Sequence, residues 1–321
     1  FIERIYTASM HSTMLFFTDR GLVYKMRVYE LPEGAKNAKG RALQNLLNIE
    51  PGDQINAFIR VKGLDDPEFT GSHYLVFATR NGIIKKTSLT EYARVMAKGK
   101  KAIIIREGDR LIGVELTDGN SEILMANRNG RAIRFHESKL RQMGRVSTGV
   151  RGMRLDDDGH DEVVGLVTMN ENSGNNVMVI SQEGFGKRSL LDDYRITNRG
   201  GKGVKTMNIT DKTGELVAFK SVNDDNDLVI INKSGITLRI HVSDIRVMGR
   251  ATQGVRLINL DKRNDVIASV CCVDADPEED VVEVLDAEEL PGLADADIEI
   301  DENDVEPDNA TEDETDADDN E

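Results

Sequence analysis

The stretch 122–136, EILMANRNGRAIRFH, contains the pattern that decides the fold. An apolar run ends at the polar turn Arg128-Asn129-Gly130, and a second apolar run with one internal base, Arg134, follows it. Two short runs joined by Asn-Gly are typical of antiparallel strands connected by a tight turn, in which glycine supplies a positive φ. We therefore predict a β-hairpin over this stretch.

The same pattern occurs five times in the chain. An apolar strand precedes a first glycine at Gly21, Gly82, Gly130, Gly184 and Gly235. A second glycine follows 17 to 19 residues later, at Gly40, Gly99, Gly149, Gly203 and Gly254. An acidic residue precedes the last apolar strand of each copy, at Asp53, Asp109, Asp161, Glu215 and Asp265. Regular spacing over five copies indicates a repeat architecture.

The repeats lie near residues 14–59, 74–116, 122–168, 176–222 and 227–273. Each has about 50 residues and room for four short strands, with little helical periodicity. This combination predicts an all-β, propeller-like fold in which four-stranded blades repeat radially within a body of residues 1–273.

The charge divides the chain into two parts. Residues 274–321 contain 24 of the 57 acids and no Lys or Arg, so residues 1–273 hold 33 acids against 41 bases. We expect a mildly basic body and a disordered acidic tail. The tail either competes with a polyanion for the body or only keeps the protein soluble. No apolar run approaches the roughly 18–20 residues that span a membrane, and two adjacent cysteines suggest a reducing, cytoplasmic compartment.

Basic residues recur at three fixed positions of the repeat. Four residues after the first glycine stand Lys25, Lys86, Arg134, Arg188 and Arg239. Two residues after the second glycine stand Lys101, Arg151, Lys205 and Arg256, with Arg41 one residue earlier in the first repeat. Four residues before the second glycine stand Lys36, Arg145, Arg199 and Arg250, and Lys39 lies in the same connection as Lys36.

Bases at fixed positions of the repeat are expected to lie on the same side of every blade. If the blades close into a wheel, these bases form continuous bands around it. Such bands suit a curved polyanion, because each neutralised phosphate releases counterions. Aromatic residues are only 5% of the chain, which argues against stacking of single-stranded bases and favours duplex DNA. In the alternative interpretation, each base pairs with an acid of its own repeat and only solvates the surface.

The repeats closely resemble the C-terminal domain of the DNA gyrase A subunit, especially in GRATQGVRLINL at 249–260 and YKMRVYELPEGAKNAKGRALQNLL at 24–47. The resemblance covers essentially residues 1–273. It implies a β-pinwheel that bends duplex DNA around its rim, so that a type II topoisomerase (an isomerase) introduces negative supercoils with ATP. The implied partners are DNA and, in a heterotetramer, the ATPase B subunit with the rest of the A subunit. The implied location is the bacterial cytoplasm, at the nucleoid.

Two departures from the family stand out. Its wheel usually has six blades and a box, Q-[KR]-R-G-G-[KR]-G, in the first. Here FIERIYTAS at 1–9 resembles the last strand of a preceding repeat, which suggests that this repeat and its box were cut off. The stretch 197–203, TNRGGKG, matches the last five box positions. We expect Arg199, Gly200, Gly201 and Lys202 to approach phosphates there; the alternative is an ordinary glycine-rich connection.

The residues suggest no catalysis by this chain. There is no phosphate-binding GxxxxGK[ST] loop, the five histidines are dispersed, and the run 156–159, DDDG, places glycine too early for a calcium loop. Tyr92 and Tyr194 occupy a slot ten residues after the first glycine that is apolar in the other repeats, so we interpret them as packing residues. We expect no catalytic residue, metal or cofactor here, and the resemblance places ATP and Mg in the holoenzyme.

Two other functions remain open at this stage. The chain also fits the C-terminal domain of a topoisomerase IV A-type subunit, which is a relative with a more variable wheel. A protein-interaction β-propeller, whose rim charges would be incidental, is the second alternative.

Overall fold

The computed structural model describes residues 8–34, 40–96, 98–157, 159–170, 173–260 and 265–274. Internal contacts divide the chain into a unit of residues 1–276 and a unit of residues 277–321, and all described residues belong to the first. The predicted tail, beyond Asp274, and all of the predicted leftover strand except Ala8 and Ser9 lie outside the described residues.

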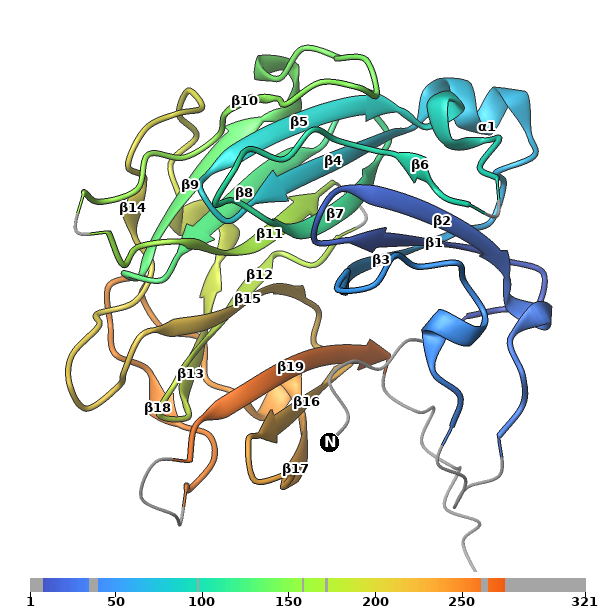
Figure 1. Cartoon of the computed structure of the whole chain (residues 1–321). Helices are drawn as coiled ribbons and strands as arrows, with labels where there is room; N and C mark the ends of the chain where they lie inside the picture. Colours follow the sequence, from blue (N-terminus) through green and yellow to red (C-terminus); the bar gives the residue numbers. More distant parts are fainter. Residues whose placement is uncertain are drawn as a thin grey trace, which may run out of the picture. The chain divides into compact units, whose positions relative to one another are not determined.

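Five antiparallel sheets succeed one another along this unit (Figure 1). In order from one edge to the other, they are β3 (Ile55–Val61), β1 (Thr13–Thr18), β2 (Leu22–Arg27), β6 (Lys100–Lys101); β7 (Leu111–Thr117), β4 (Tyr74–Thr79), β5 (Ile83–Ser88), β10 (Val150–Arg151); β11 (Val163–Met169), β8 (Glu122–Asn127), β9 (Arg131–His136), β14 (Val204–Lys205); β15 (Leu216–Val222), β12 (Asn176–Ser181), β13 (Phe185–Leu190), β18 (Val255–Arg256); and β19 (Ile267–Asp274), β16 (Asn226–Asn232), β17 (Thr237–His241). The predicted all-β, propeller-like fold is confirmed.

The two-residue strand at the outer edge of a sheet comes from the following repeat. In the first sheet Leu22 pairs with Lys101 and Val23 with Lys100, a strand that belongs to the second repeat. The same exchange places β10, β14 and β18 on the second, third and fourth sheets. The fifth sheet has three strands within the described residues. A sequence repeat and a blade therefore differ by one strand, which the repeat pattern alone did not reveal.

In the second, third and fifth repeats the recurring acidic residue accepts a hydrogen bond from a backbone N–H in the hairpin turn of its own repeat. Glu215 of the fourth repeat instead pairs with Arg128 of the third. Asp161 accepts hydrogen bonds from the backbone N–H of Asn129 (3.3 Å) and from the side-chain amide of Asn127 (2.6 Å). Asp109 likewise accepts from the backbone N–H of Asn81 (3.0 Å). The predicted glycines are in the left-handed region, as at Gly130, where φ is 74°. The predicted hairpins are confirmed.

Hydrophobic cores fill the spaces between consecutive sheets. Phe17 of the first sheet meets Phe77 of the second edge to face, with ring centroids 5.5 Å apart. Separate clusters join the second sheet to the third, the third to the fourth, and the fourth to the fifth. Because a central strand packs on both faces, it reads as a continuous apolar run, as in LVFA at 75–78.

Short helical turns link the sheets to the connections that lead to the outer strands. Five of them follow the second strand of a hairpin directly: η1 (Val28–Glu30), η3 (Leu89–Tyr92), η4 (Glu137–Lys139), η5 (Leu191–Asp193) and η6 (Val242–Asp244). The first repeat also has η2 (Leu43–Asn45), and α1 (Pro67–Ser72) precedes the second sheet. The slot ten residues after the first glycine is buried at Tyr92, Leu140, Tyr194 and Ile245, so its interpretation as a packing position is confirmed.

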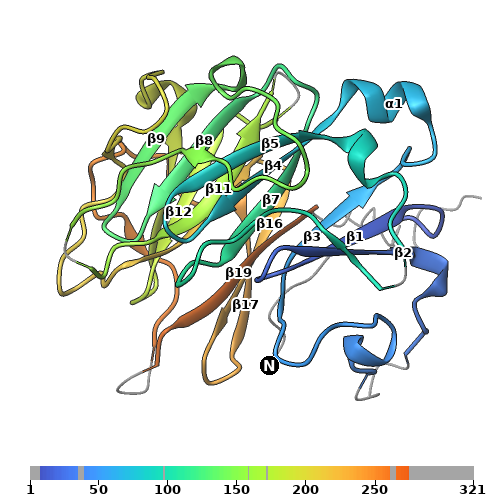
Figure 2. The ribbon, with the colours of Figure 1, turned by 45° about the horizontal axis from the view of Figure 1, so that its top comes forward.

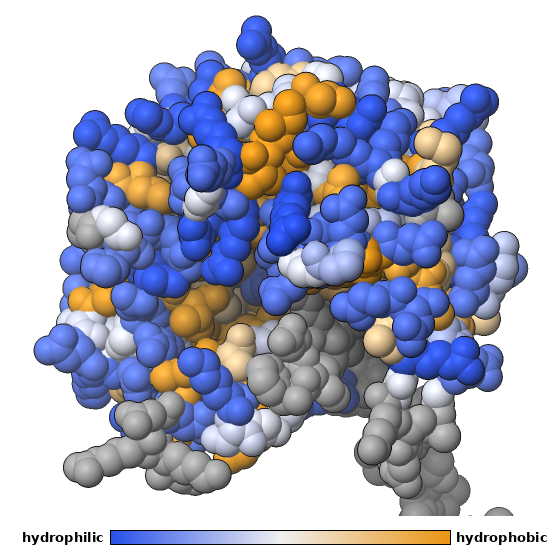
Figure 3. Space-filling model, in the orientation of Figure 1, coloured by the Kyte–Doolittle hydropathy of each residue, from blue (hydrophilic) through white to orange (hydrophobic). Residues whose placement is uncertain are grey.

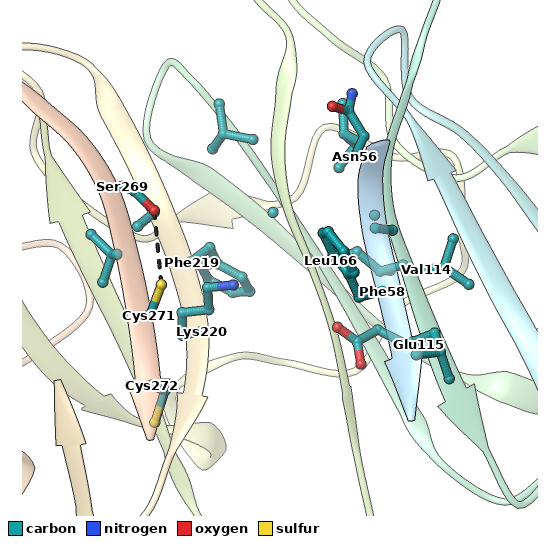
Figure 4. A pocket seen from close by; sticks show the side chains of 18 of the residues that line it. Asn56, Phe58, Val114, Glu115, Leu166, Phe219, Lys220, Ser269, Cys271 and Cys272 are labelled. Carbon is teal, nitrogen blue, oxygen red and sulfur yellow. Dashed lines mark hydrogen bonds between the residues drawn. The ribbon is translucent and has the colours of Figure 1, made fainter. Parts of the chain in front are cut away.

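Figure 2 shows the inner strands β3, β7, β11 and β19 of four sheets. Together with β15 they line a cavity of about 610 Å³ (Figure 4). Glu115 and Lys220 point into it from β7 and β15. Burial raises the pKa of Glu115 to about 7, and the positive charge of Lys220 opposes this rise. Among the described residues, no helix is long and apolar enough to cross a membrane.

The strand exchange predicts which glycines are indispensable. A Cβ on Gly149 would lie 2.5 Å from the carbonyl oxygen of Ile84 in the sheet that β10 completes, and its φ is 101°. Gly108 has a φ of 73° but nothing within 4 Å of such a Cβ. We expect Gly149→Ala to lower the free energy of unfolding by more than about 3 kcal/mol and Gly108→Ala by only about 1 kcal/mol. Urea denaturation of both variants tests this, and equal losses would contradict a steric requirement at Gly149.

Candidate nucleic-acid interface

Four of the predicted bases lie at the outermost edge of four successive sheets. Lys101, Arg151, Lys205 and Arg256 are each the second residue of an exchanged outer strand, and all four are exposed. We call these four residues the rim bases. Because of the strand exchange, residues at one repeated position of the sequence all lie at the outer edge of a sheet. Each of four blades therefore carries one of these bases at its outer edge.

The rim bases are not neutralised by nearby carboxylates. Within the described residues none of them forms an ion pair with Asp or Glu. Lys205 donates to the side-chain oxygen of Asn208 (3.1 Å), and the Arg256 guanidinium lies 5.1 Å from the Phe185 ring centroid. Arg41 of the first repeat is exposed as well, whereas Lys36 and Lys39 lie outside the described residues. These cations are available to an anionic partner.

The arginines four residues before the second glycine hold the backbone of the rim bases in place. Arg199 donates through Nη1 to the carbonyl oxygen of Arg151 (3.0 Å), and Arg250 donates to that of Lys205 (2.8 Å). Arg145 makes the same contact to the carbonyl of Lys101. Each of these arginines therefore fixes the rim base of the repeat before it.

Three of the bases four residues after the first glycine are buried. Lys86, Arg134 and Arg188 are each at most 8% exposed. Lys86 pairs with Glu137 of the next repeat (3.3 Å). Arg134 pairs with Glu122 and donates to the carbonyl of Tyr194 (2.9 Å) in the next repeat.

The other members of this set are also engaged. Arg188 donates to the carbonyl of Ile245 (2.5 Å) and pairs with Asp224. Lys25 donates to the carbonyl of Ala93 (3.1 Å), and Arg239 pairs with Asp227 (2.5 Å) although it is exposed. For this set the geometry favours the alternative interpretation, because these bases join carboxylates and the carbonyls of the following repeat. Lys86, Arg134 and Arg188 are therefore less accessible to a phosphate than the sequence suggests, and DNA contact by this set stays a prediction.

The box-like stretch 197–203 forms a backbone clasp on the third repeat. Gly200, with a φ of 83°, donates its N–H to the carbonyl of Gly152 (2.6 Å), and the carbonyl of Gly201 accepts from Arg154 (2.9 Å). Lys202 pairs with Asp156 (2.9 Å) and lowers the pKa of that carboxyl. Arg199, Gly201 and Lys202 remain exposed next to Arg151 and are still predicted to contact phosphates.

Two fully buried lysines were missed by the sequence analysis. Lys85 donates to the carbonyl oxygens of Ala102 (2.6 Å) and Arg145, and Lys187 donates to those of Gly249 and Arg250 (2.8 Å each). Burial lowers the pKa of Lys85 to about 7 and that of Lys187 to about 8. The only available signal was that each precedes a repeated base in a strand, so the two side chains must point to opposite faces.

The remaining polar groups show no reactive arrangement. Burial raises the pKa of Tyr194 to about 12, where its hydroxyl is 2.5 Å from that of Thr206, and burial also raises the pKa of Tyr92. Among the described residues, no group of three or more His, Cys, Asp or Glu could hold a metal ion. Polar residues dominate the face visible in Figure 3, with hydrophobic residues between them.

Comparison with known proteins identifies the family. Residues 12–62, 73–118, 121–168, 175–223 and 226–274 match the family described as DNA gyrase C-terminal domain, beta-propeller. The chain belongs to this family. It is 41% identical over 283 residues to the DNA gyrase A subunit of Staphylococcus aureus strain NCTC 8325 / PS 47, and the same holds for strain COL. That match includes 88% of this chain but 31% of the relative, so the chain spans about a third of such a protein.

Solved structures of two related domains share the fold. The C-terminal domain of DNA topoisomerase IV superposes with a TM-score of 0.72 at 25% identity, covering 83% of this chain and 80% of that domain. A DNA gyrase A C-terminal domain gives 0.70 at 22% identity, covering 83% and 84%. The two values are nearly equal, so the fold does not separate the gyrase type from the topoisomerase IV type.

Buried and rim arginines of the gyrase C-terminal domain should differ in their effect on stability. Arg134→Met leaves the half-buried Glu122 carboxylate and two carbonyls without their buried cation, so we expect a loss of about 3 kcal/mol in the free energy of unfolding. Arg256→Met changes an exposed side chain, and we expect a loss below about 1 kcal/mol. Urea denaturation measures both; a similar cost at the two positions would contradict the division into structural and rim bases.

The buried lysines should make stability depend on pH. The pKa of Lys187 is about 8 in the folded chain against an ordinary value of 10.5, so the unfolded chain binds more protons between these limits. Stability from this group therefore increases as pH rises from about 8 to about 10.5. Relative to Lys187→Met, the wild type should gain on the order of 2–3 kcal/mol between pH 7.5 and pH 10. A difference that does not change over this interval would show that Lys187 keeps an ordinary pKa.

Proposed function

We propose that the chain binds duplex DNA along its rim and bends it around the wheel, as the DNA-wrapping part of a gyrase A subunit. One observation carries the proposal: four successive sheets each expose one cation at the same position of the outer strand, without a neighbouring carboxylate. A duplex presents phosphates continuously along its length, so spaced cations on a curved edge neutralise many of them at once. Membership of the gyrase C-terminal domain family supports the same function.

The contribution to the whole enzyme follows from bending. A duplex held on a curved rim brings its ends toward a strand-passage site, and an ATP-hydrolysing holoenzyme of A and B subunits would use this to introduce negative supercoils. Bending a site of 20–30 bp costs of order 1–6 kcal/mol, so several phosphate contacts must act together. In this proposal the chain itself supplies binding and bending, and the type II topoisomerase chemistry belongs to the rest of the protein.

The 41% identity to gyrase A subunits favours gyrase over topoisomerase IV. A protein-interaction propeller is less consistent with four exposed, unpaired cations in register than a DNA-binding wheel is.

Neutralising the rim should weaken binding in a salt-dependent way. In the full chain, we expect Lys101→Gln, Arg151→Gln, Lys205→Gln and Arg256→Gln together to reduce the slope of log K against log salt by about 3–4 for a duplex of about 140 bp. A duplex of about 20 bp reaches fewer blades, so its slope should be smaller and change less.

A matched control separates position from net charge. Lys62→Gln, Arg106→Gln, Lys220→Gln and Lys233→Gln remove the same charge from exposed residues outside the outer strands. This second quadruple variant should keep the steep slope of the wild type on the long duplex. If both variants lose slope equally, or neither does, the rim is not the binding surface.

A further inference from the structure

The connection that leads to each outer strand has to be held in place, because its arginine fixes the preceding rim base. Arg145, Arg199 and Arg250 occupy the same position in three successive repeats, and each donates to the carbonyl of a rim base. The side chain can hold this contact only if the backbone of the connection is itself anchored. The structure shows two different anchors.

The connection of the fourth repeat is anchored through glycine. The N–H of Gly200 reaches the carbonyl of Gly152 at 2.6 Å, and a Cβ on Gly201 would lie 3.6 Å from Ile133. Ile133, which is 1% exposed, stands three residues after the first glycine of the third repeat. The φ of 83° at Gly200, which glycine adopts without strain, allows its N–H to reach the carbonyl of Gly152. The other backbone bond, from Arg154 to the carbonyl of Gly201, has equivalents in the third repeat (Ile104 to Ser147, 3.0 Å) and the fifth (Asn208 to Thr252, 3.1 Å), so the Gly200 bond is what distinguishes this connection.

The connections of the third and fifth repeats lack the double glycine. Their sequences are RVSTG at 145–149 and RATQG at 250–254, compared with RGGKG at 199–203. In both cases the residue at the position of Ile133 is a buried lysine. Lys85 donates to the carbonyl of Arg145, and Lys187 donates to that of Arg250 at 2.8 Å. The lysine thus binds the backbone of the arginine whose side chain holds the rim base.

We propose that Lys85 and Lys187 are positioning residues of the DNA-binding rim, which anchor the outer connections where the glycine clasp of the fourth repeat is absent. The proposal deepens the proposed function and rests on it for the readout with DNA. The chain of contacts is the same in both places: a buried ammonium or amine, the carbonyl of a connection arginine, its guanidinium, and the carbonyl of the preceding rim base.

The surroundings of the lysines fit an anchor of this kind. Both are 0% exposed, and their nitrogens find carbonyl or hydroxyl oxygens instead of carboxylates. Tyr92 donates to Ala102, the carbonyl that Lys85 also uses. Lys187 donates to two carbonyls of its connection, whereas Lys85 donates to one carbonyl of its connection and to that of Ala102. A buried donor is costly to leave unpaired, so each lysine holds its connection in one position. The position is therefore fixed before any DNA arrives.

The first test compares Lys187→Met with Val179→Ala in the full chain. Val179 is the cross-strand partner of Lys187 and is fully buried, so its truncation destabilises the same sheet without touching the connection. In Lys187→Met we expect amide hydrogen exchange in residues 246–256 to become at least ten-fold faster than in Val179→Ala. The slope of log K against log salt for a duplex of about 140 bp should fall by about 2, because Lys205 and Arg256 lose their positions.

The second test exchanges one anchor for the other. Lys85→Ile should loosen residues 141–151, and adding Val146→Gly and Ser147→Gly recreates the arrangement of Ile133 with Gly200 and Gly201. We expect the triple variant to recover both the protection of 141–151 and the salt slope. Lys85→Ile combined with Asn120→Gly and Asn175→Gly serves as the control, because it adds two glycines at exposed positions outside the connection and should not rescue.

The outcomes separate this inference from the proposed function. If Lys187→Met exchanges no faster than Val179→Ala in residues 246–256, or the triple variant fails to recover protection, the positioning role is overturned. If exchange changes as expected while the rim quadruple variant keeps its full salt slope, the anchors are real and the rim is not the DNA surface. Faster exchange together with a lower slope supports both.

Discussion

Among the described residues, four of the five blades are completed by two residues of the next repeat, and the rest of the structure depends on this exchange. The carbonyl of Gly82 accepts hydrogen bonds from Gly152 (2.8 Å) and Met153 (3.2 Å), which belong to the following repeat. Neither backbone could approach so closely with a side chain at Gly82, whose Cβ would lie 2.6 Å from the Met153 carbonyl oxygen. Consecutive repeats are therefore coupled through the backbone as well as through the hydrophobic cores, and stability is shared between neighbours.

The exchange also determines what each set of bases can do. A base inside a hairpin strand, such as Arg134, lies beside the incoming repeat and is used to hold it. A base on the donated strand, such as Arg151, lies beyond the last hydrogen-bonded neighbour and faces solvent. Removing the partner of a buried cation costs far more than removing an exposed one. The same residue type therefore serves structure at one position and is left free to bind at another.

Much of this architecture was predictable because it is local. The hairpin glycines, the apolar slot at Tyr92 and the four rim bases follow from spacing within one repeat. The strand exchange was not predictable, because Leu22 pairs with Lys101, 79 residues later in the chain, and no local sequence pattern identifies the partner strand. The repeat pattern assigned Lys86 and Lys101 to fixed positions of the repeat. It could not show that Lys86 is buried and pairs with Glu137. Lys85 was missed because a lysine occupies this position in only two of the five repeats, at Lys85 and Lys187.

A rim whose backbone is fixed by arginines of the neighbouring repeat would suit a bent duplex. Bending requires several phosphate contacts to act at fixed spacing, and a mobile lysine loses entropy when it is ordered on binding. Here the backbone under Lys101, Arg151 and Lys205 is already fixed by a guanidinium of the next repeat. The cost of ordering this backbone is met during folding, which would leave more of each phosphate contact for bending a bound duplex. The curvature of the DNA would then follow from the spacing of the blades rather than from any single strong contact.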